Sequence, residues 1–185
     1  QIVVGEEIKH RTLKNTVSFG VSRSTIFFGK WIVSVVGVFV LAITSISIAL
    51  VFIYALLENS GTVFLTDFLM ALVAFIPLMI SGITLYHVLY FVSGSPNYAV
   101  MIFAGVQVLP YIVGKYIGGR IEILSWIYRH TPFYLFSVSE MTESRRVIMA
   151  GNTTEGMLTC WADGGVLTVV FLTFGYFRFR KLEIK

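Results

Sequence analysis

Charged side chains are scarce in this sequence. Asp, Glu, Lys and Arg make up 13% of its 185 residues, whereas 56% of the residues are hydrophobic. A water-soluble domain uses about 25% charged residues to cover its surface. The shortage excludes an ordinary soluble domain and indicates a chain whose surface is largely covered by lipid.

Cysteine and the motifs of nucleotide chemistry are nearly absent as well. Cys160 is the only cysteine, which excludes an intrachain disulfide and a Cys/His zinc cluster. A phosphate-binding loop needs a glycine five positions before its Gly-Lys pair and Ser or Thr after it. Neither Gly29-Lys30 nor Gly114-Lys115 meets this requirement. We therefore expect no catalytic residue, no metal site and no nucleotide site in this chain, so that any ATP is hydrolysed elsewhere.

Ionisable residues are also rare inside the apolar runs. Intramembrane enzymes and proton-driven carriers place such residues in their spans, because the chemistry requires them despite the cost of burial. Here only His87 and Asp163 qualify. His87 is interpreted as a hydrogen-bonded packing residue and Asp163 as an interfacial or vestibule residue, with a substrate pathway as the alternative for both. Glu140 and Glu143 are not adjacent, which argues against a paired-glutamate intramembrane protease.

What the chain has in abundance is long apolar sequence. A helix needs roughly 20 residues to cross a hydrocarbon core of about 30 Å, and the apolar runs, the last of them interrupted at Asp163, are long enough for four such helices. The fold class predicted is therefore all-α, a polytopic helical membrane protein. The four spans are expected at 31–57, 68–92, 98–115 and 157–177.

The remaining segments divide the chain into a cytoplasmic segment, 1–30, and a transmembrane domain, 31–185. Within that domain, the mixed segment 116–156 is expected to form short amphipathic helices that are separated at Thr131-Pro132, the second ending at 151–154. Residues 178–185 form a short basic tail.

The basic residues predict the orientation of the spans. The first 30 residues hold five Lys and Arg and the tail holds four, whereas the loop from Glu58 to Asp67 holds none. The positive-inside rule then places both ends of the chain in the cytoplasm and the segment 116–156 outside, at the cell membrane. Cys160 is expected to be reachable from outside.

An aromatic group lies in the outer segment and comprises Trp126, Tyr128, Phe133, Tyr134 and Phe136. Such residues gather at membrane interfaces because their rings are amphipathic. An interfacial belt is favoured for this group, and a substrate surface remains the alternative.

The most informative stretch is the basic segment from Glu6 to Lys30. Its first part is moderately amphipathic as a helix, Ser18 and Gly20 should end that helix, and Ser22 or Ser24 can cap the next one, which runs into the first span. Two interpretations are open from the residues alone. The segment either touches anionic lipid or is a helix that docks on a protein.

Within this stretch four short sequences resemble a known family. Glu6-Glu7, Thr12-Leu13-Lys14-Asn15, Gly20-Val21-Ser22-Arg23 and Gly29-Lys30 are similar to the first cytoplasmic loop of type-2 ATP-binding-cassette (ABC) exporter permeases. This group includes bacteriocin-immunity and antibiotic-efflux permeases of Gram-positive bacteria. In that family the loop forms a coupling helix that docks on a separate ATPase subunit.

The resemblance implies that the four spans are the last four of six, with the outer segment connecting the fifth and sixth. It implies two partners, an ABC ATPase subunit that binds ATP and Mg²⁺ and a second permease subunit, in a bacterial plasma membrane. The substrate would be a hydrophobic or amphipathic peptide, drug or lipid. The residues that would contact the ATPase subunit are Lys9, Arg11, Thr12, Leu13, Lys14, Asn15, Gly20, Val21, Ser22 and Arg23.

Two alternatives to a permease share the same hydropathy. One is a membrane assembly or scaffold subunit without transport, and the other is a channel, which the shortage of charged pore residues disfavours. Nucleic-acid binding is not expected, because the basic residues flank spans where the positive-inside rule already explains them. Membrane lipid is expected as a partner in every case.

Overall fold

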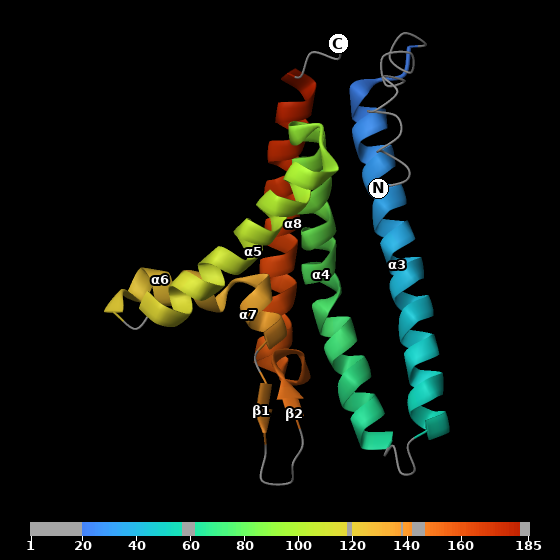
Figure 1. Cartoon of the computed structure of the whole chain (residues 1–185), viewed down its shortest axis with the longest axis vertical. Coiled ribbons are helices and arrows are strands. Elements are labelled where there is room, and N and C mark those ends of the chain that lie inside the picture. The colour runs from blue at the N-terminus through green and yellow to red at the C-terminus, as the bar shows by residue number, and fades with distance from the viewer. Residues whose placement is uncertain (1–19, 57–61, 118–119, 138, 142–146, 182–185) are drawn as a thin grey trace.

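The structure is a computed structural model of the chain and describes residues 20–56, 62–117, 120–137, 139–141 and 147–181. Most of the described residues are helical, and four helices are long and apolar enough to cross a membrane, so the all-α prediction is confirmed at this level. Figure 1 shows the elements in space. In chain order they are α3 (Arg23–Leu56), α4 (Thr62–Ser93), α5 (Pro96–Ile117), α6 (Glu122–Arg129), α7 (Pro132–Ser137), β1 (Ser139–Met141), β2 (Val147–Met149), η2 (Ala150–Asn152) and α8 (Thr154–Lys181).

The start of α3 follows directly from its sequence. Gly20 has φ +85°, a left-handed conformation that glycine adopts without a steric cost. The Oγ atom of Ser22 then accepts a hydrogen bond from the backbone N of Thr25 at 3.1 Å, so Ser22 caps the helix as predicted. Because α3 begins at Arg23, the last basic residues of the 1–30 segment belong to the same helix as the first apolar run.

Glycine and proline define the turn between α4 and α5 in the same way. Gly94 ends α4 with φ +64°, and its backbone N donates to the carbonyl oxygen of Tyr90. Pro96 begins α5, where its fixed φ suits the first helical position and its missing N–H costs nothing.

α4 and α8 form the centre of the molecule and pack against each other along their length. Two glycines of α8 make this close approach possible. A Cβ atom at Gly164 would lie 2.4 Å from the carbonyl carbon of Pro77, and one at Gly175 would lie 2.3 Å from a methyl carbon of Val88. Small residues allow helices to approach in lipid, where dispersion contacts rather than water exclusion drive association.

α3 is attached to this pair at one end only. Its buried residues, Ile26 and Phe27, both lie within its first two turns. Trp31 adds a hydrogen bond from its indole Nε1 to the Thr84 hydroxyl of α4, at 2.9 Å. Beyond that point α3 runs beside α4 with its apolar side chains exposed (Figure 1).

The segment between α5 and α8 contains more than the two expected short helices. α6 and α7 are separated at Thr131, as predicted. However, α7 ends at Ser137 and not at 151–154, because an antiparallel hairpin follows it, with Ser139 opposite Met149 and Met141 opposite Val147. β-Branched Val147 and Ile148 favour extended backbone. Residues 151 and 152 instead belong to the 3₁₀ turn η2.

Candidate functional site

The predicted contact residues for an ATPase subunit are described only in part. Six of them, Lys9, Arg11, Thr12, Leu13, Lys14 and Asn15, lie outside the described residues. The other four, Gly20, Val21, Ser22 and Arg23, form the turn and the cap at the start of α3. Val21 is 37% exposed.

Arg23 connects the start of α3 to the end of α8. Its Nη1 atom donates a hydrogen bond to the backbone carbonyl oxygen of Arg180 at 2.9 Å. Cationic groups near the last carbonyls of a helix are favourable because those carbonyls lack intrahelical partners and carry partial negative charge. The bond joins residues 157 positions apart, so the two ends of the described chain meet at one end of the bundle (Figure 1).

One turn further along α3, Phe27 is the centre of an aromatic cluster at the same end of the molecule. Its ring lies within 5.2 to 6.2 Å of the rings of five neighbours, measured between centroids, and its side chain is fully buried. We call this group the Phe27 cluster, and its other members are Phe28, His87, Phe91, Tyr176 and Phe179. It joins α3 to both α4 and α8 by the large apolar area that aromatic side chains bury.

His87 belongs to the Phe27 cluster and not to a groove. Its side chain is 3% exposed and its ring contacts Phe27 and Phe91, with centroid distances of 5.2 and 4.8 Å. His87 is therefore surrounded by packed aromatic rings, as expected for a packing residue. Its buried Nε2 atom makes no hydrogen bond within the described part of the chain.

Asp163 lies in a different place, on α8 near the outer segment. Its Oδ2 atom is 2.8 Å from Nδ1 of His130, the residue that follows α6. Trp126 lies beside that imidazole, with 4.5 Å between ring centroids. Gly164 packs on Pro77, and His87 is ten residues further along α4, a rise of about 15 Å. The structure therefore does not bring Asp163 and His87 together.

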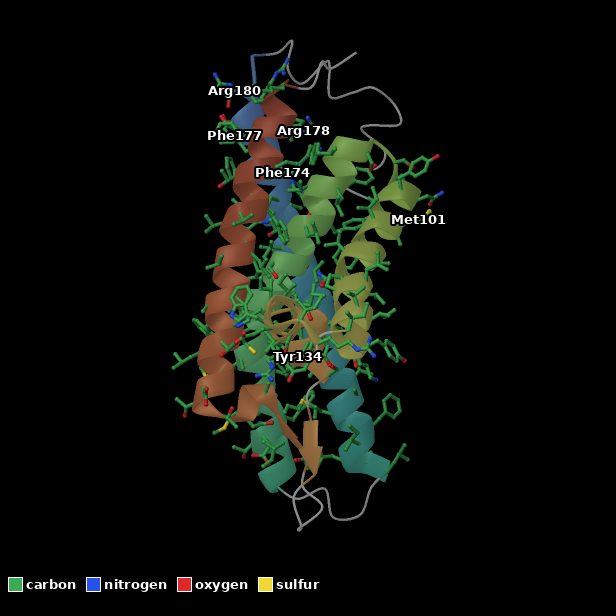
Figure 2. The ribbon with its side chains drawn as sticks, turned by 90° about the vertical axis from the view of Figure 1, so that its left-hand side faces the viewer. Met101, Tyr134, Phe174, Phe177, Arg178 and Arg180 are labelled. Atoms are coloured by element: carbon green, nitrogen blue, oxygen red, sulfur yellow. The ribbon has the colours of Figure 1, made fainter. Side chains whose placement is uncertain are left out.

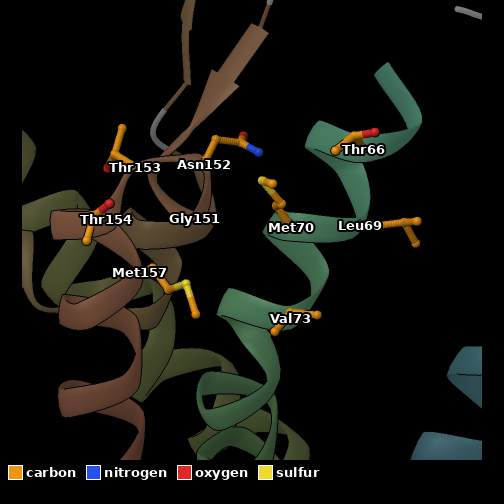
Figure 3. Close-up of a pocket in the computed structure, with 9 residues that line it drawn as sticks. All are labelled: Thr66, Leu69, Met70, Val73, Gly151, Asn152, Thr153, Thr154 and Met157. Atoms are coloured by element: carbon orange, nitrogen blue, oxygen red, sulfur yellow. The ribbon is translucent and has the colours of Figure 1, made fainter. Parts of the chain in front are cut away.

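An open groove lies between α4 and the start of α8 on the side of the outer segment, and Figure 3 shows its lining. Its volume is about 470 Å³. Its apolar residues are Leu69, Met70, Val73 and Met157, and its polar ones are Thr66, Asn152, Thr153 and Thr154. Uncharged walls with hydroxyl and amide groups at one end can accept an amphipathic molecule but provide no group for acid or base catalysis.

Asn152 holds the polar end of this groove in place. Its side-chain Nδ2 donates to the backbone carbonyl oxygen of Asp67 on α4, and its Oδ1 accepts from the backbone N of Met149. Gly151 packs beside it, where a Cβ atom would lie 2.8 Å from that of Ala74. The hairpin and η2 are thereby fixed to α4.

The aromatic group of the outer segment is largely used in packing. Phe133 contacts Tyr111 of α5 and Phe136 contacts Phe75 of α4, with centroid distances of 4.6 and 4.7 Å. Tyr128 covers Gly114, where a Cβ atom would lie 2.2 Å from its own. Burial raises the pKa of the Tyr128 phenol. Trp126 is the most exposed member, at 62%, and Phe133 and Phe136 remain partly exposed, at 41% and 43%.

Cys160 corrects one expectation from the sequence. Its side chain is fully buried in a cluster with Ala71, Phe75 and Leu78 of α4. A reagent added from either side would not reach it, because α8 turns this face toward α4. Accessibility therefore has to be tested at another position.

Sequence patterns gave no signal for the groove or for the connection between Arg23 and Arg180. Met70 and Met157 look like any other apolar residue of a span, and the partner of Arg23 is a backbone carbonyl. Within the described ranges, no three His, Cys, Asp or Glu residues lie close enough to hold a metal ion. Comparison of the sequence and structure with protein-family models, curated proteins and solved structures found no match.

Proposed function

We propose that this chain is the permease subunit of an ATP-driven exporter of the ABC type, which moves a hydrophobic or amphipathic substrate across the cell membrane. A separate ATPase subunit would bind and hydrolyse ATP, and a second permease subunit would complete the pathway. Neither end of the described chain would face the outside, and residues 6–23 would contact the ATPase subunit.

The observation that carries this proposal is the attachment of α3 at its first turns. A force applied to residues 20–23 reaches α8 through the bond between Arg23 and Arg180, and reaches α4 through Phe27 and Trp31. Packed helices shift as rigid units because close-packed interiors resist continuous deformation. Closure of an ATPase subunit could therefore tilt three helices at once.

The free length of α3 supports the same mechanism. Past Trp31 the helix makes few contacts with the other described helices, and many of its apolar residues are more than 40% exposed, from Ile32 to Leu56. A helix held at one end can change its angle with little disruption of packing. The outer groove, with apolar walls and a polar end, is of a kind that suits an amphipathic substrate.

Co-purification with the candidate ATPase subunit tests the proposal. The combined variant Leu13→Ala, Lys14→Ala and Arg23→Ala removes an apolar contact and two cations from the docking segment. We expect the amount of bound ATPase to fall at least tenfold and the permease-stimulated ATPase activity to fall with it, since each charge-assisted contact contributes about 1.5–3 kcal/mol.

Arg120→Ala is the matched control, because it removes an exposed cation that follows the C-terminal end of α5 and lies outside the docking segment. It should leave both the association and the stimulated activity unchanged. If the combined variant folds, shown by an unchanged elution profile, and still binds and stimulates the ATPase fully, the coupling assignment is wrong.

A further inference from the structure

A second groove lies on the last turns of α8, on the face that points away from α4. Residues that line it recur at helical spacing and include Val170, Phe174, Phe177, Arg178 and Lys181. The buried face of the same helix carries Cys160, Gly164, Gly175 and Phe179. At 100° per residue Val170, Phe174, Phe177 and Lys181 lie about 80° or more from Gly164, whereas Arg178 lies at the edge between the two faces. The groove is open and is lined by α8 alone, with a volume of about 490 Å³.

The groove is polarised along the helix. Its apolar residues occupy the part nearer the middle of α8, and its two cations occupy the end. Figure 2 labels Phe174, Phe177 and Arg178 along these turns. Among the described residues, no acidic side chain forms an ion pair with Arg178 or Lys181. Two basic groups therefore stand at the end of an apolar groove, and the described part of the chain provides no carboxylate to pair with them.

The dimensions of the groove match one leaflet of a bilayer. From Val170 to Lys181 the helix rises about 16 Å, and half of a hydrocarbon core of about 30 Å is about 15 Å. An acyl chain lying against Val170, Phe174 and Phe177 would therefore bring its headgroup to the level of Arg178 and Lys181. Arg and Lys both bind phosphate oxygens, through charge-assisted hydrogen bonds.

We propose that this groove of α8 binds an anionic phospholipid, with the acyl chain on the apolar residues and the headgroup phosphate between Arg178 and Lys181. A second copy of the chain fits this face less well. A symmetric contact would bring two Arg178 and two Lys181 side chains together, and residues 174–181 contain no Asp or Glu to balance them. The site does not depend on an ATPase subunit, so it can be tested apart from the proposed function.

Native mass spectrometry of the full chain in detergent tests the site. The protein is titrated with phosphatidylglycerol and, separately, with phosphatidylcholine, and the apparent Kd of each is measured. We expect the native chain to prefer phosphatidylglycerol. The variant Arg178→Gln with Lys181→Gln should weaken phosphatidylglycerol binding by about fivefold per cation, because a basic residue at the membrane surface contributes about 1 kcal/mol. Phosphatidylcholine carries the same phosphate beside a cationic choline, so its weaker binding should change less.

Arg180→Gln is the matched control, since Arg180 carries the same charge at the same helix end but does not line the groove. It should leave the phosphatidylglycerol Kd unchanged. Equal weakening by Arg180→Gln would show a general effect of surface charge and would overturn the proposal, as would no weakening in the double variant.

Two further experiments test whether a free anion or a second copy of the chain occupies the groove instead of a lipid. Inorganic phosphate at millimolar concentration should not displace the lipid, and displacement would mean that the cations bind a free anion. In a Cys160→Ala chain, Phe177→Cys should not cross-link copies of the protein in phosphatidylglycerol nanodiscs. Efficient cross-linking would show that a second copy covers the groove and would contradict the lipid assignment.

Discussion

Single glycines decide how closely the two central helices approach. Gly164 of α8 meets the backbone of α4 at Pro77, and a Cβ atom there would lie 2.4 Å from a carbonyl carbon and 2.6 Å from the nitrogen of Leu78. Backbone atoms cannot swing aside as the end of a flexible side chain can. The neighbouring Gly165 has no such contact within 4 Å. The two adjacent glycines can therefore be compared directly by the same substitution.

Gly164→Ala should destabilise the protein, and Gly165→Ala should not. Overpacking at position 164 is expected to cost about 1–3 kcal/mol, whereas alanine at position 165 should gain up to about 1 kcal/mol from helix propensity. Unfolding by heat in detergent, followed by circular dichroism, measures the difference. Equal stability of the two variants would contradict the packing described for α4 and α8.

At the level of elements, α3 is a helix with one fixed end. Phe27 is fully buried among the rings of the Phe27 cluster, whereas Phe52, six turns or more along the same helix, is 60% exposed. The contribution of a phenylalanine to stability should therefore depend on where it lies along α3.

Phe27→Ala should lower the free energy of unfolding by about 3–5 kcal/mol, the usual cost of removing a buried phenylalanine. Phe52→Ala, the same chemical change at the free end, should have an effect below about 1 kcal/mol. Detergent unfolding checks both variants, and the fluorescence of Trp31, one turn from Phe27, reports the local release of α3. A large effect of Phe52→Ala would show that the rest of α3 is packed as well.

The sequence predicts these elements well where a helix depends only on neighbouring residues along the chain. Charge-free runs longer than 20 residues require membrane helices, and Ser22 after Gly20 is a local capping signal. The helices nevertheless extend beyond the expected spans, from Arg23 rather than Trp31 in the first case. A span predicted from hydropathy ends at the nearest charged residue, whereas the backbone hydrogen bonds of the helix continue past that residue.

The contacts between elements could not be predicted in the same way. The long helices are apolar on every face, so no stripe identifies which side of α8 meets α4, and the burial of Cys160 was missed for this reason. The bond from Arg23 to the Arg180 carbonyl joins residues 157 positions apart. The hairpin of β1 and β2 was also missed, because two strands of three residues are too short for an alternating pattern.

For the whole molecule, the geometry brings the start of α3 and the end of α8 to one end and the hairpin of β1 and β2 toward the other (Figure 1). If the basic end is cytoplasmic, as the positive-inside rule predicts, single cysteines should report it. Because Cys160 is buried, the test uses a Cys160→Ala background with a new cysteine at Glu155 or at Lys181, both of which are exposed.

In intact cells a membrane-impermeant maleimide should label the cysteine at position 155 and not the one at position 181. The cysteine at 181 should react once the membrane is permeabilised, which controls for its intrinsic reactivity. Labelling of position 181 alone in intact cells would reverse the orientation, and with it the side on which an ATPase subunit could bind.

The most direct test of the central claim is transport itself. The chain is reconstituted in liposomes with the candidate ATPase subunit, and the movement of a fluorescent phospholipid, a hydrophobic dye and an amphipathic peptide is followed with ATP and with a non-hydrolysable analogue. An exporter permease should move at least one probe in a manner that requires ATP hydrolysis and is lost in the Leu13→Ala, Lys14→Ala and Arg23→Ala variant. Movement without ATP would indicate a channel, and stable association without movement of any probe would indicate a scaffold; either result would contradict the account.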